Sequence, residues 1–470
     1  MNLKNISFND FRFWLMLFFI IRLWGIQDPP LEISHSWRQS LTSMMTRNLA
    51  KNDFQVLSPE IDSAGEKSGV IGSEFPAFNI IPAGFSRFFG FQHGYGRLLN
   101  LIVTTLGIWA FYKIICEMES PKAAFFSGMM LLFSCWFAFS RKNMPDTFSA
   151  SLVIIGLYFF LNWKTHPKRI FALILGCIFA SLGMLSKMPS AVLLTPIALF
   201  LFQEFREHRI DLIFISAIVI SILPALIWYF FWVPEIIRTH GYELYFPRTF
   251  FTGLTELVEM WPKTIEKFYF SALSSYLAFL IFLAGFISLL IKKEVNRLGL
   301  FALVCIPFFF FMIKAGNVFS LHNYYIIPFV PLMAWVAGKF LAHVNKRLGY
   351  ILLILAAGES IANQQHDFFI KPNQWYKTSL EKICKDYIPK KSRIITAGGN
   401  SPQLLFFCNR KGWALEPEEL NNTQPINKLR TLGAEFLIFD KHHGNRDCQG
   451  KIIFQNEDFV VFDIRNTRTE

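Results

Sequence analysis

Charged side chains are scarce in this chain of 470 residues, because Asp, Glu, Lys and Arg together make up only 17% of it. Water-soluble proteins carry about 25% charged residues. Here 53% of the residues are hydrophobic, 54 are Phe, and the mean hydropathy is +0.36. This composition excludes an ordinary cytosolic enzyme, and the long apolar runs exclude a disordered or fibrous chain. It indicates a polytopic α-helical membrane protein.

Ligand-binding signatures are also missing. The seven cysteines form no CxxC or Cys/His pattern, so the sequence predicts no metal site. The C-terminal tail has no glycine-rich phosphate loop and no internal repeat. The net charge of +12 does not indicate nucleic acid as a partner, because basic residues of membrane proteins gather in cytoplasmic loops.

Long apolar runs are what the sequence does have. A transmembrane helix needs about 20 apolar residues, and about eleven runs approach that length. They lie near 11–27, 98–116, 123–140, 147–163, 170–186, 189–203, 210–233, 269–291, 298–314, 324–342 and 349–362. The first run contains Arg22 and is followed by no cleavage site, so we expect it to be a retained span rather than a signal peptide.

The charges of the connections predict an orientation. With a cytoplasmic N-terminus, the short connections assigned to the cytoplasm are all basic: Lys122; Lys164, Lys168 and Arg169; Arg206 and Arg209; Lys292, Lys293 and Arg297; Lys346 and Arg347. Short basic loops stay in the cytoplasm. The first outer loop (28–97), the stretch 234–268 and the tail from 363 are then outside. We expect an integral protein of the plasma (inner) membrane.

The tail differs from the rest of the chain. From Ser392 it reads SRIITAGG and LLFFCNRKGW, then a helix-like stretch, then GAEFLIFDK, KIIFQ and FVVFDI. Short β-branched and aromatic runs around a helical stretch predict a small soluble α/β domain. The predicted domains are therefore a transmembrane domain at 1–362 and an extracytoplasmic α/β domain at 363–470, the latter without catalytic residues.

The first outer loop (28–97) holds the most informative residues. Residues 36–49 and 76–89 are predicted as amphipathic helices lying at the membrane interface. Charge near the lipid boundary is costly and usually has a partner or a task. The loop carries a dense set of ionisable residues: Asp28, Glu32, His35, Arg38, Asp62 and Glu74. Solvated loop charge is the alternative for each residue taken alone.

Six short segments are all predicted on one side of the membrane: HSWRQ (35–39), SPEID (58–62), SEFPAFN (73–79), RKNMPD (141–146), LSKMPS (185–190) and HNYYIIPFVP (322–331). In these segments and in its layout, the chain resembles the GT-C glycosyltransferases over about residues 10–345. It is most similar to the group that holds the protein O-mannosyltransferases and the lipid A aminoarabinose transferases.

The resemblance implies an enzyme that transfers a sugar from a polyprenyl-phosphate donor to a lipid, glycan or protein acceptor, with inversion. The mannosyltransferases carry an Asp-Glu pair in the first loop, with a His three residues after the Asp. Counting back from His35 makes Glu32 the catalytic residue, but no second acid stands beside it. Asp28 and Asp62 stay open as alternatives, and Asp146 matches the acid of the second outer loop. No cofactor is predicted, and a divalent metal stays open.

The residue types suit this chemistry. An inverting displacement needs a carboxylate to take the acceptor's proton and cations to neutralise the leaving phosphate. The predicted donor-phosphate ligands are Arg38, Arg141, Lys187, His322 and Tyr324. The predicted substrate-binding residues are His35, Trp37, Asp62, Glu74 and Tyr325. Two alternatives stay open. Lys187 could be an interface lysine, and Trp37 could belong to an interfacial aromatic belt.

Two other functions stay open. A secondary transporter would also be polytopic, but it should show paired halves and rarely needs a long first loop with an outer α/β tail. A polysaccharide ligase without this donor chemistry would carry its large loop late in the chain. Both remain alternatives to the glycosyltransferase.

Overall fold

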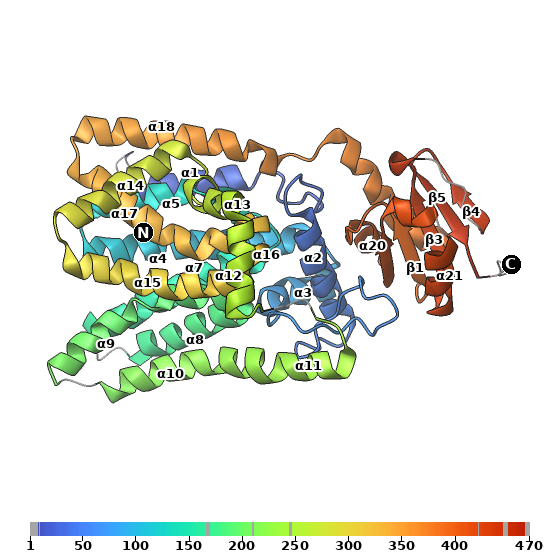
Figure 1. The fold of residues 1–470 in the computed structure, drawn as a ribbon, viewed down its shortest axis with the longest axis horizontal. Helices are drawn as coiled ribbons and strands as arrows, with labels where there is room; N and C mark the ends of the chain where they lie inside the picture. The colour runs from blue at the N-terminus through green and yellow to red at the C-terminus, as the bar shows by residue number, and fades with distance from the viewer. Residues whose placement is uncertain are drawn as a thin grey trace. The chain divides into compact units, whose positions relative to one another are not determined.

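A computed structural model describes the chain except for residues 1–7, 9, 166–169, 209–210, 244–246, 422, 445–449 and 466–470. Lys168, Arg169 and Arg209, predicted as cytoplasmic charges, lie outside the described residues. The chain folds into two compact units (Figure 1). Unit 1 comprises Met1–Ile26, Arg97–Phe231 and Tyr245–Phe368, and unit 2 comprises Gln27–Gly96, Trp232–Leu244 and Phe369–Glu470.

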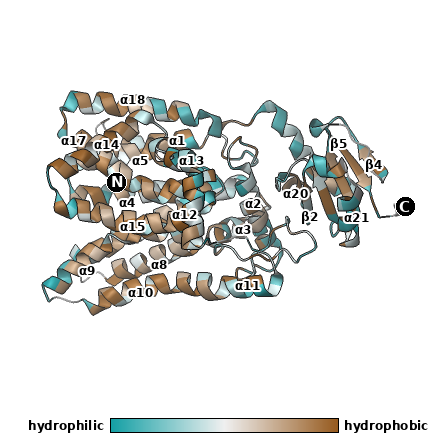
Figure 2. Cartoon of the chain, viewed as in Figure 1, coloured by the Kyte–Doolittle hydropathy of each residue, from teal (hydrophilic) through white to brown (hydrophobic). Residues whose placement is uncertain are grey.

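Unit 1 is helical. Its longer helices are α1 (Phe11–Arg22), α4 (Gly94–Met118), α5 (Pro121–Phe133), α7 (Pro145–Thr165), α8 (Ile170–Ser186), α9 (Ile197–Arg206), α10 (Leu212–Ile227), α12 (Phe250–Glu259), α14 (Tyr276–Ile291), α15 (Val295–Ala315), α17 (Val330–His343) and α18 (Lys346–Gln364). Shorter pieces are α6 (Trp136–Phe139), η2 (Met188–Leu194), η3 (Trp228–Trp232), α13 (Trp261–Glu266), η4 (Lys267–Ser271), α16 (Asn317–Leu321), η5 (Asn323–Phe329) and η6 (Gln365–Phe368). Figure 2 shows hydrophobic residues along helices such as α10 and α15.

Five helices of the described chain are long and apolar enough to cross a membrane, and seven if each bent pair counts as one span. The predicted number of about eleven spans is not confirmed. Several predicted runs form short or broken helices: α5 has 13 residues, η2 and α9 meet at 42°, and the segment before α14 meets it at 88°. Apolar run length gives no information on such breaks, because the sequence of a bent pair is as apolar as that of a straight helix.

Small residues allow the helices of unit 1 to pack closely. A Cβ on Gly338 of α17 would lie 2.2 Å from the backbone nitrogen of Ser127 on α5. In the same way, a Cβ on Gly156 of α7 would lie 2.7 Å from the backbone nitrogen of Ala180 on α8. Close approach at small residues is the usual packing mode of membrane helices.

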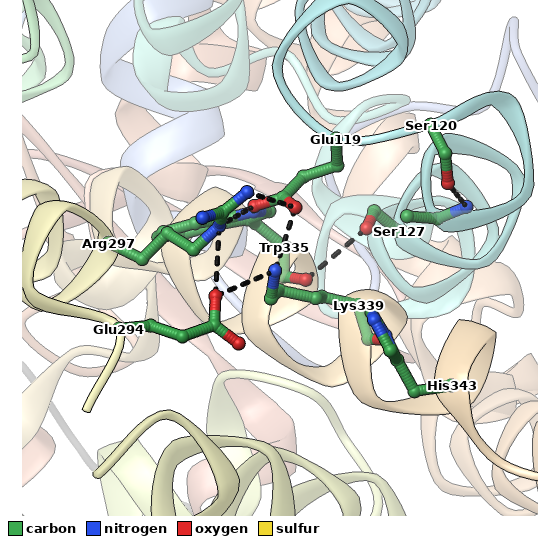
Figure 3. Close-up of polar contacts among 9 residues, drawn as sticks. Glu119, Ser120, Ser127, Glu294, Arg297, Trp335, Lys339 and His343 are labelled. Atoms are coloured by element: carbon green, nitrogen blue, oxygen red, sulfur yellow. Dashed lines mark hydrogen bonds and ion pairs between the residues drawn. The ribbon is translucent and has the colours of Figure 1, made fainter. Parts of the chain in front are cut away.

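A network of ion pairs joins the ends of three helices of unit 1 (Figure 3). Glu119, which follows α4, accepts hydrogen bonds from Arg297 Nε at 2.9 Å and from Lys339 Nζ at 2.7 Å. Glu294 pairs with the same two cations, each at 3.0 Å. Burial would raise the pKa of Glu119, but Arg297 and Lys339 outweigh it and lower that pKa. The network therefore holds Glu119 ionised and ties α4, α15 and α17 together.

We expect Glu119→Gln to lower the free energy of unfolding by about 3–5 kcal/mol, toward the lower end because Glu294 still pairs with both cations. The change leaves the largely buried Lys339 with one carboxylate fewer. Thermal unfolding in detergent measures the effect. Glu117→Gln, an exposed position on α4, is the matched control. Equal midpoints for the two variants would contradict a stabilising role of the network.

Unit 2 combines the first outer loop with the tail. Its helices are α2 (Ser36–Lys51), α3 (Ala77–Phe89), α11 (Val233–His240), η7 (Pro372–Ser379) and α19 (Leu380–Tyr387). Leu41, Met44 and Met45 of α2 belong to the same buried cluster as Ile383 of α19. The apolar stripe of α2 therefore packs in the core of unit 2, whereas α3 leaves Ile81, Phe85, Phe88 and Phe89 exposed.

The tail forms the small α/β structure that its sequence predicts. A five-stranded sheet has the order β2-β1-β3-β5-β4, with β1 (Arg393–Ala397), β2 (Gly412–Leu415) and β3 (Ala434–Asp440) parallel. β4 (Lys451–Gln455) and β5 (Phe459–Asp463) complete it as antiparallel strands. The other elements are α20 (Gln403–Cys408), η8 (Pro417–Asn421), α21 (Thr423–Thr431) and η9 (Lys441–His443). The apolar run 404–408 is thus a buried helix, not a strand, because periodicity cannot separate the two in so short a run.

Candidate active site

Asp146 and Lys187 form the centre of a polar cluster in unit 1. Asp146 is in the first turn of α7, which begins at Pro145, and it is 3% exposed. A carboxylate at that position is stabilised by the helix dipole. Lys187 immediately precedes η2, and its ammonium forms an ion pair with Asp146. The backbone oxygen of Lys187 accepts a hydrogen bond from Ser149 Oγ at 3.2 Å, which fixes the end of α8 against α7.

The segment HNYY at 322–325 completes this cluster. The ammonium of Lys187 lies 4.5 Å from the ring centroid of Tyr324 and 5.2 Å from that of Tyr325. The rings of His322 and Tyr324 are stacked, with centroids 5.1 Å apart. A cation beside two phenol rings is partly desolvated and held in place. The structure therefore brings together four residues that the sequence predicted as site residues, together with Asp146.

Arg141 contacts the ends of other elements of unit 1. Its guanidinium donates to the backbone oxygens of Arg22 at 3.3 Å, of Asp367 at 3.2 Å and of Trp24. It also lies over the ring of Phe368, 4.5 Å from the centroid. These contacts join the end of α1 to η6, which follows α18, so they give Arg141 a packing role. Its predicted part in donor binding stays a prediction.

The first outer loop places Glu32 in a buried position of unit 2. Glu32 is 2% exposed, and its Oε2 accepts a hydrogen bond from Gln39 Nε2 at 3.1 Å. Gln39 is fully buried on α2. Gln39 was not predicted as a site residue, although it is the last residue of the HSWRQ segment. This hydrogen bond from a buried amide fixes the orientation of the Glu32 carboxylate.

Arg38 and Glu74, predicted for different roles, form an ion pair with each other. Both side chains are largely buried. A guanidinium paired in this way is already neutralised, so Arg38 would have to exchange partners to bind a phosphate.

Asp62 has structural partners in unit 2. It accepts a hydrogen bond from Arg47 Nη2 at 2.7 Å and another from Asn48 Nδ2 at 2.9 Å. Arg47 also donates to the backbone oxygen of Phe406 in the tail, at 2.8 Å. Asp62 therefore ties α2 to α20 through Arg47. This pairing was not visible in the sequence, because it depends on how α2 meets the tail.

The remaining predicted residues lie in the first turn of α2 or precede it. His35 caps α2 with a left-handed backbone conformation (φ 66°), which non-glycine residues adopt rarely. Trp37 is 43% exposed, and Asp28 is half-buried. The residues that the structure describes include no group of three or more His, Cys, Asp or Glu side chains placed to hold a metal ion.

Comparisons with known proteins agree with this architecture. Residues 73–228 match the model of the dolichyl-phosphate-mannose-protein mannosyltransferase family. The structure of ArnT from Cupriavidus metallidurans is similar over 98% of this chain and 99% of ArnT, with a TM-score of 0.61 and 11% identity. Its complex with undecaprenyl phosphate has a TM-score of 0.59 and 12% identity over 96% of this chain and 97% of ArnT. The fold is that of the GT-C glycosyltransferases.

A further solved structure of this fold is the oligosaccharyltransferase AglB from Archaeoglobus fulgidus, in complex with an inhibitory peptide and a dolichol-phosphate. It has a TM-score of 0.55 and 12% identity over 91% of this chain and 69% of AglB. Among curated proteins, none matches the chain in sequence. The resemblance stated from the sequence is confirmed at the level of the superfamily, and with it the identification of a glycosyltransferase. The chain is an integral membrane protein.

Proposed function

We propose that this GT-C protein moves a sugar from a polyprenyl-phosphate donor to a hydroxyl or amine of a lipid, glycan or protein acceptor. The observation that supports it best is the likeness to ArnT along nearly the whole chain, together with the undecaprenyl phosphate that ArnT binds. The match to a dolichyl-phosphate-mannose-dependent family agrees with a lipid-phosphate donor. In this proposal the membrane supplies the donor and the outer face presents the acceptor.

The proposed step is an inverting displacement. The acceptor oxygen or nitrogen forms a bond to the anomeric carbon, the bond from that carbon to the phosphate oxygen breaks, and the polyprenyl phosphate leaves with the bonding electrons. The acceptor's proton passes to a carboxylate, for which we propose Glu32 with Gln39 orienting it. Asp146 holds the ammonium of Lys187 beside the Tyr324 ring, where we propose that polar groups meet the donor.

Donor turnover tests the proposed function directly. Membranes that contain the chain, incubated with radiolabelled polyprenyl-phosphate sugars, should move label into an acceptor fraction, and membranes with Asp146→Asn should move much less. A transporter would redistribute intact donor across the membrane without forming a product. A polysaccharide ligase would leave these monosaccharide donors unused and consume polyprenyl-linked polysaccharide instead.

We further propose that the N-terminus is cytoplasmic and that the tail from 363 is outside, because the short connections assigned inside are basic. A reporter that is active only in the cytoplasm, fused after Arg465, should therefore be silent. The same reporter fused after Lys293, in a basic connection, should be active. Strong activity after Arg465 would overturn the orientation and the odd number of spans.

A further inference from the structure

One buried lysine of unit 1 has no carboxylate partner. Lys267, the first residue of η4, is 5% exposed. Its ammonium donates a hydrogen bond to Asn323 Oδ1. Among the residues that the structure describes, no Asp or Glu forms an ion pair with it. A neutral amide does not compensate the charge of a buried ammonium.

The other lysines buried in the described chain are compensated. Three lysines are buried there: Lys142, Lys267 and Lys339. Lys142 pairs with Asp367 at 2.6 Å, and Lys339 pairs with Glu119 at 2.7 Å and with Glu294 (Figure 3). Lys267 therefore differs from lysines that serve packing in this molecule. A buried cation without an ion-pair partner is costly, and an anionic ligand bound beside it would offset that cost.

The surroundings of Lys267 connect it to the polar cluster described above. Asn323, its partner, directly precedes Tyr324 and Tyr325, whose rings lie beside the ammonium of Lys187. The ammonium of Lys267 thus contacts Asn323, and the ammonium of Lys187 contacts the next two residues of the same segment. Lys187 forms an ion pair with Asp146, whereas Lys267 forms an ion pair with no described Asp or Glu and has only the longer-range attraction of the neighbouring Glu266.

The element that carries Lys267 supports a ligand at this position. η4 is a π-helical turn, a rare form that is frequent at functional sites. Ser271, at the other end of the same turn, has a buried Oγ without a hydrogen-bond partner in the part of the chain that the structure describes. An ammonium and a free hydroxyl on one turn are donors that suit a phosphate group.

We propose that Lys267 binds the phosphate of the lipid-linked donor, an inference that rests on the proposed function. The ligand is a phosphate ester at the membrane, and two sources have that chemistry: the polyprenyl phosphate of the donor and the headgroup of an anionic phospholipid. Because Asp146 already compensates the charge of Lys187, we assign the phosphate to Lys267 rather than to Lys187. Lys187 then positions Asp146 and the tyrosines.

Binding of a polyprenyl phosphate to the whole chain tests this assignment. The wild type, Lys267→Gln and Lys267→Arg are placed in nanodiscs of phosphatidylcholine, and affinity is measured from the rise of the unfolding midpoint with added lipid. Lys263→Gln is the matched control, because Lys263 is exposed, lies one turn earlier on α13 and removes the same charge. A parallel series replaces polyprenyl phosphate with phosphatidylglycerol.

Lys267→Gln should weaken the binding of polyprenyl phosphate about 10- to 100-fold, as expected for the loss of a charge-assisted contact. Lys267→Arg should recover part of it, and Lys263→Gln should bind like the wild type. Without ligand, Lys267→Gln should be at least as stable as the wild type, since it removes an uncompensated charge. A purely structural lysine would instead lose stability and keep its affinity.

Each of the other outcomes of this experiment leads to a different conclusion. If the wild type binds polyprenyl phosphate and Lys267→Gln binds it equally, the assignment of Lys267 is wrong and the proposed function stands. If phosphatidylglycerol gives the same Lys267-dependent stabilisation, the site is a general lipid site and the donor assignment is overturned. If the wild type binds no polyprenyl phosphate, the proposed function itself fails.

Discussion

Replacing Glu32 by glutamine should lower the rate of sugar transfer about 10²–10⁴-fold, the usual effect of losing a general base. Glutamine keeps the size of the side chain and can still accept from the amide of Gln39, so the buried site should keep its packing. Only the capacity to take a proton is lost. The measurement is single-turnover transfer from a polyprenyl-phosphate sugar, with donor binding followed in parallel.

Donor affinity separates this result from misfolding. Because the proposed base acts on the acceptor, Glu32→Gln should bind polyprenyl phosphate nearly as well as the wild type. Gln39→Ala should reduce transfer less than Glu32→Gln does, since it removes only the group that orients the carboxylate. If Glu32→Gln turns over nearly as fast as the wild type while Asp28→Asn is inactive, the base is Asp28. If neither change matters, this catalytic role has to be given up.

Replacing Asp62 by asparagine should destabilise the protein by about 3–5 kcal/mol, because it leaves the buried guanidinium of Arg47 without its carboxylate. The pair joins α2 to the tail through the backbone oxygen of Phe406, so the loss should loosen unit 2. Thermal unfolding in detergent measures it. Glu60→Gln, which breaks the partly exposed pair with Lys411, should cost at most about 1 kcal/mol.

A second substitution tests whether Asp62 is structural. Removing the stranded charge with Arg47→Met in the Asp62→Asn background should recover stability, because a buried pair replaced at both ends is often tolerated. Transfer activity should recover with stability. An Asp62→Asn variant that folds like the wild type but does not turn over would instead make Asp62 a catalytic residue, which is the alternative that the sequence left open.

The sequence predicts the features that depend on neighbouring residues, and it misses those that depend on contacts between residues far apart in the chain. The small α/β tail and the helix beginning at Ser36 follow from local patterns, and the structure contains both. The number of spans does not follow, because the breaks beside η2 and α14 leave no mark in the hydropathy. The burial of α2 was also not predicted. Its apolar stripe fits a membrane surface as well as a protein core.

The candidate site also contains residues that the sequence predicted and residues that it did not. Glu32, Asp146, Lys187 and the segment 322–325 were recognised from residue type and order. Lys267 was not, because a lysine just before the apolar run 269–291 resembles an interface residue until its burial is known. Arg141 and Arg38 looked equivalent to Lys187 in sequence, yet Arg141 donates to backbone carbonyls and Arg38 forms an ion pair with Glu74.

By itself, the sequence determined that this is a polytopic membrane protein with a soluble α/β tail and GT-C features, since composition, run length and motif order are properties of the linear chain. Only the tertiary structure decided which charges are compensated. Lys142 and Asp367 are 225 residues apart, and Asp146 and Lys187 are 41 apart. Ion pairs over such separations depend on helix packing, and the same packing leaves the ammonium of Lys267 with an amide as its partner.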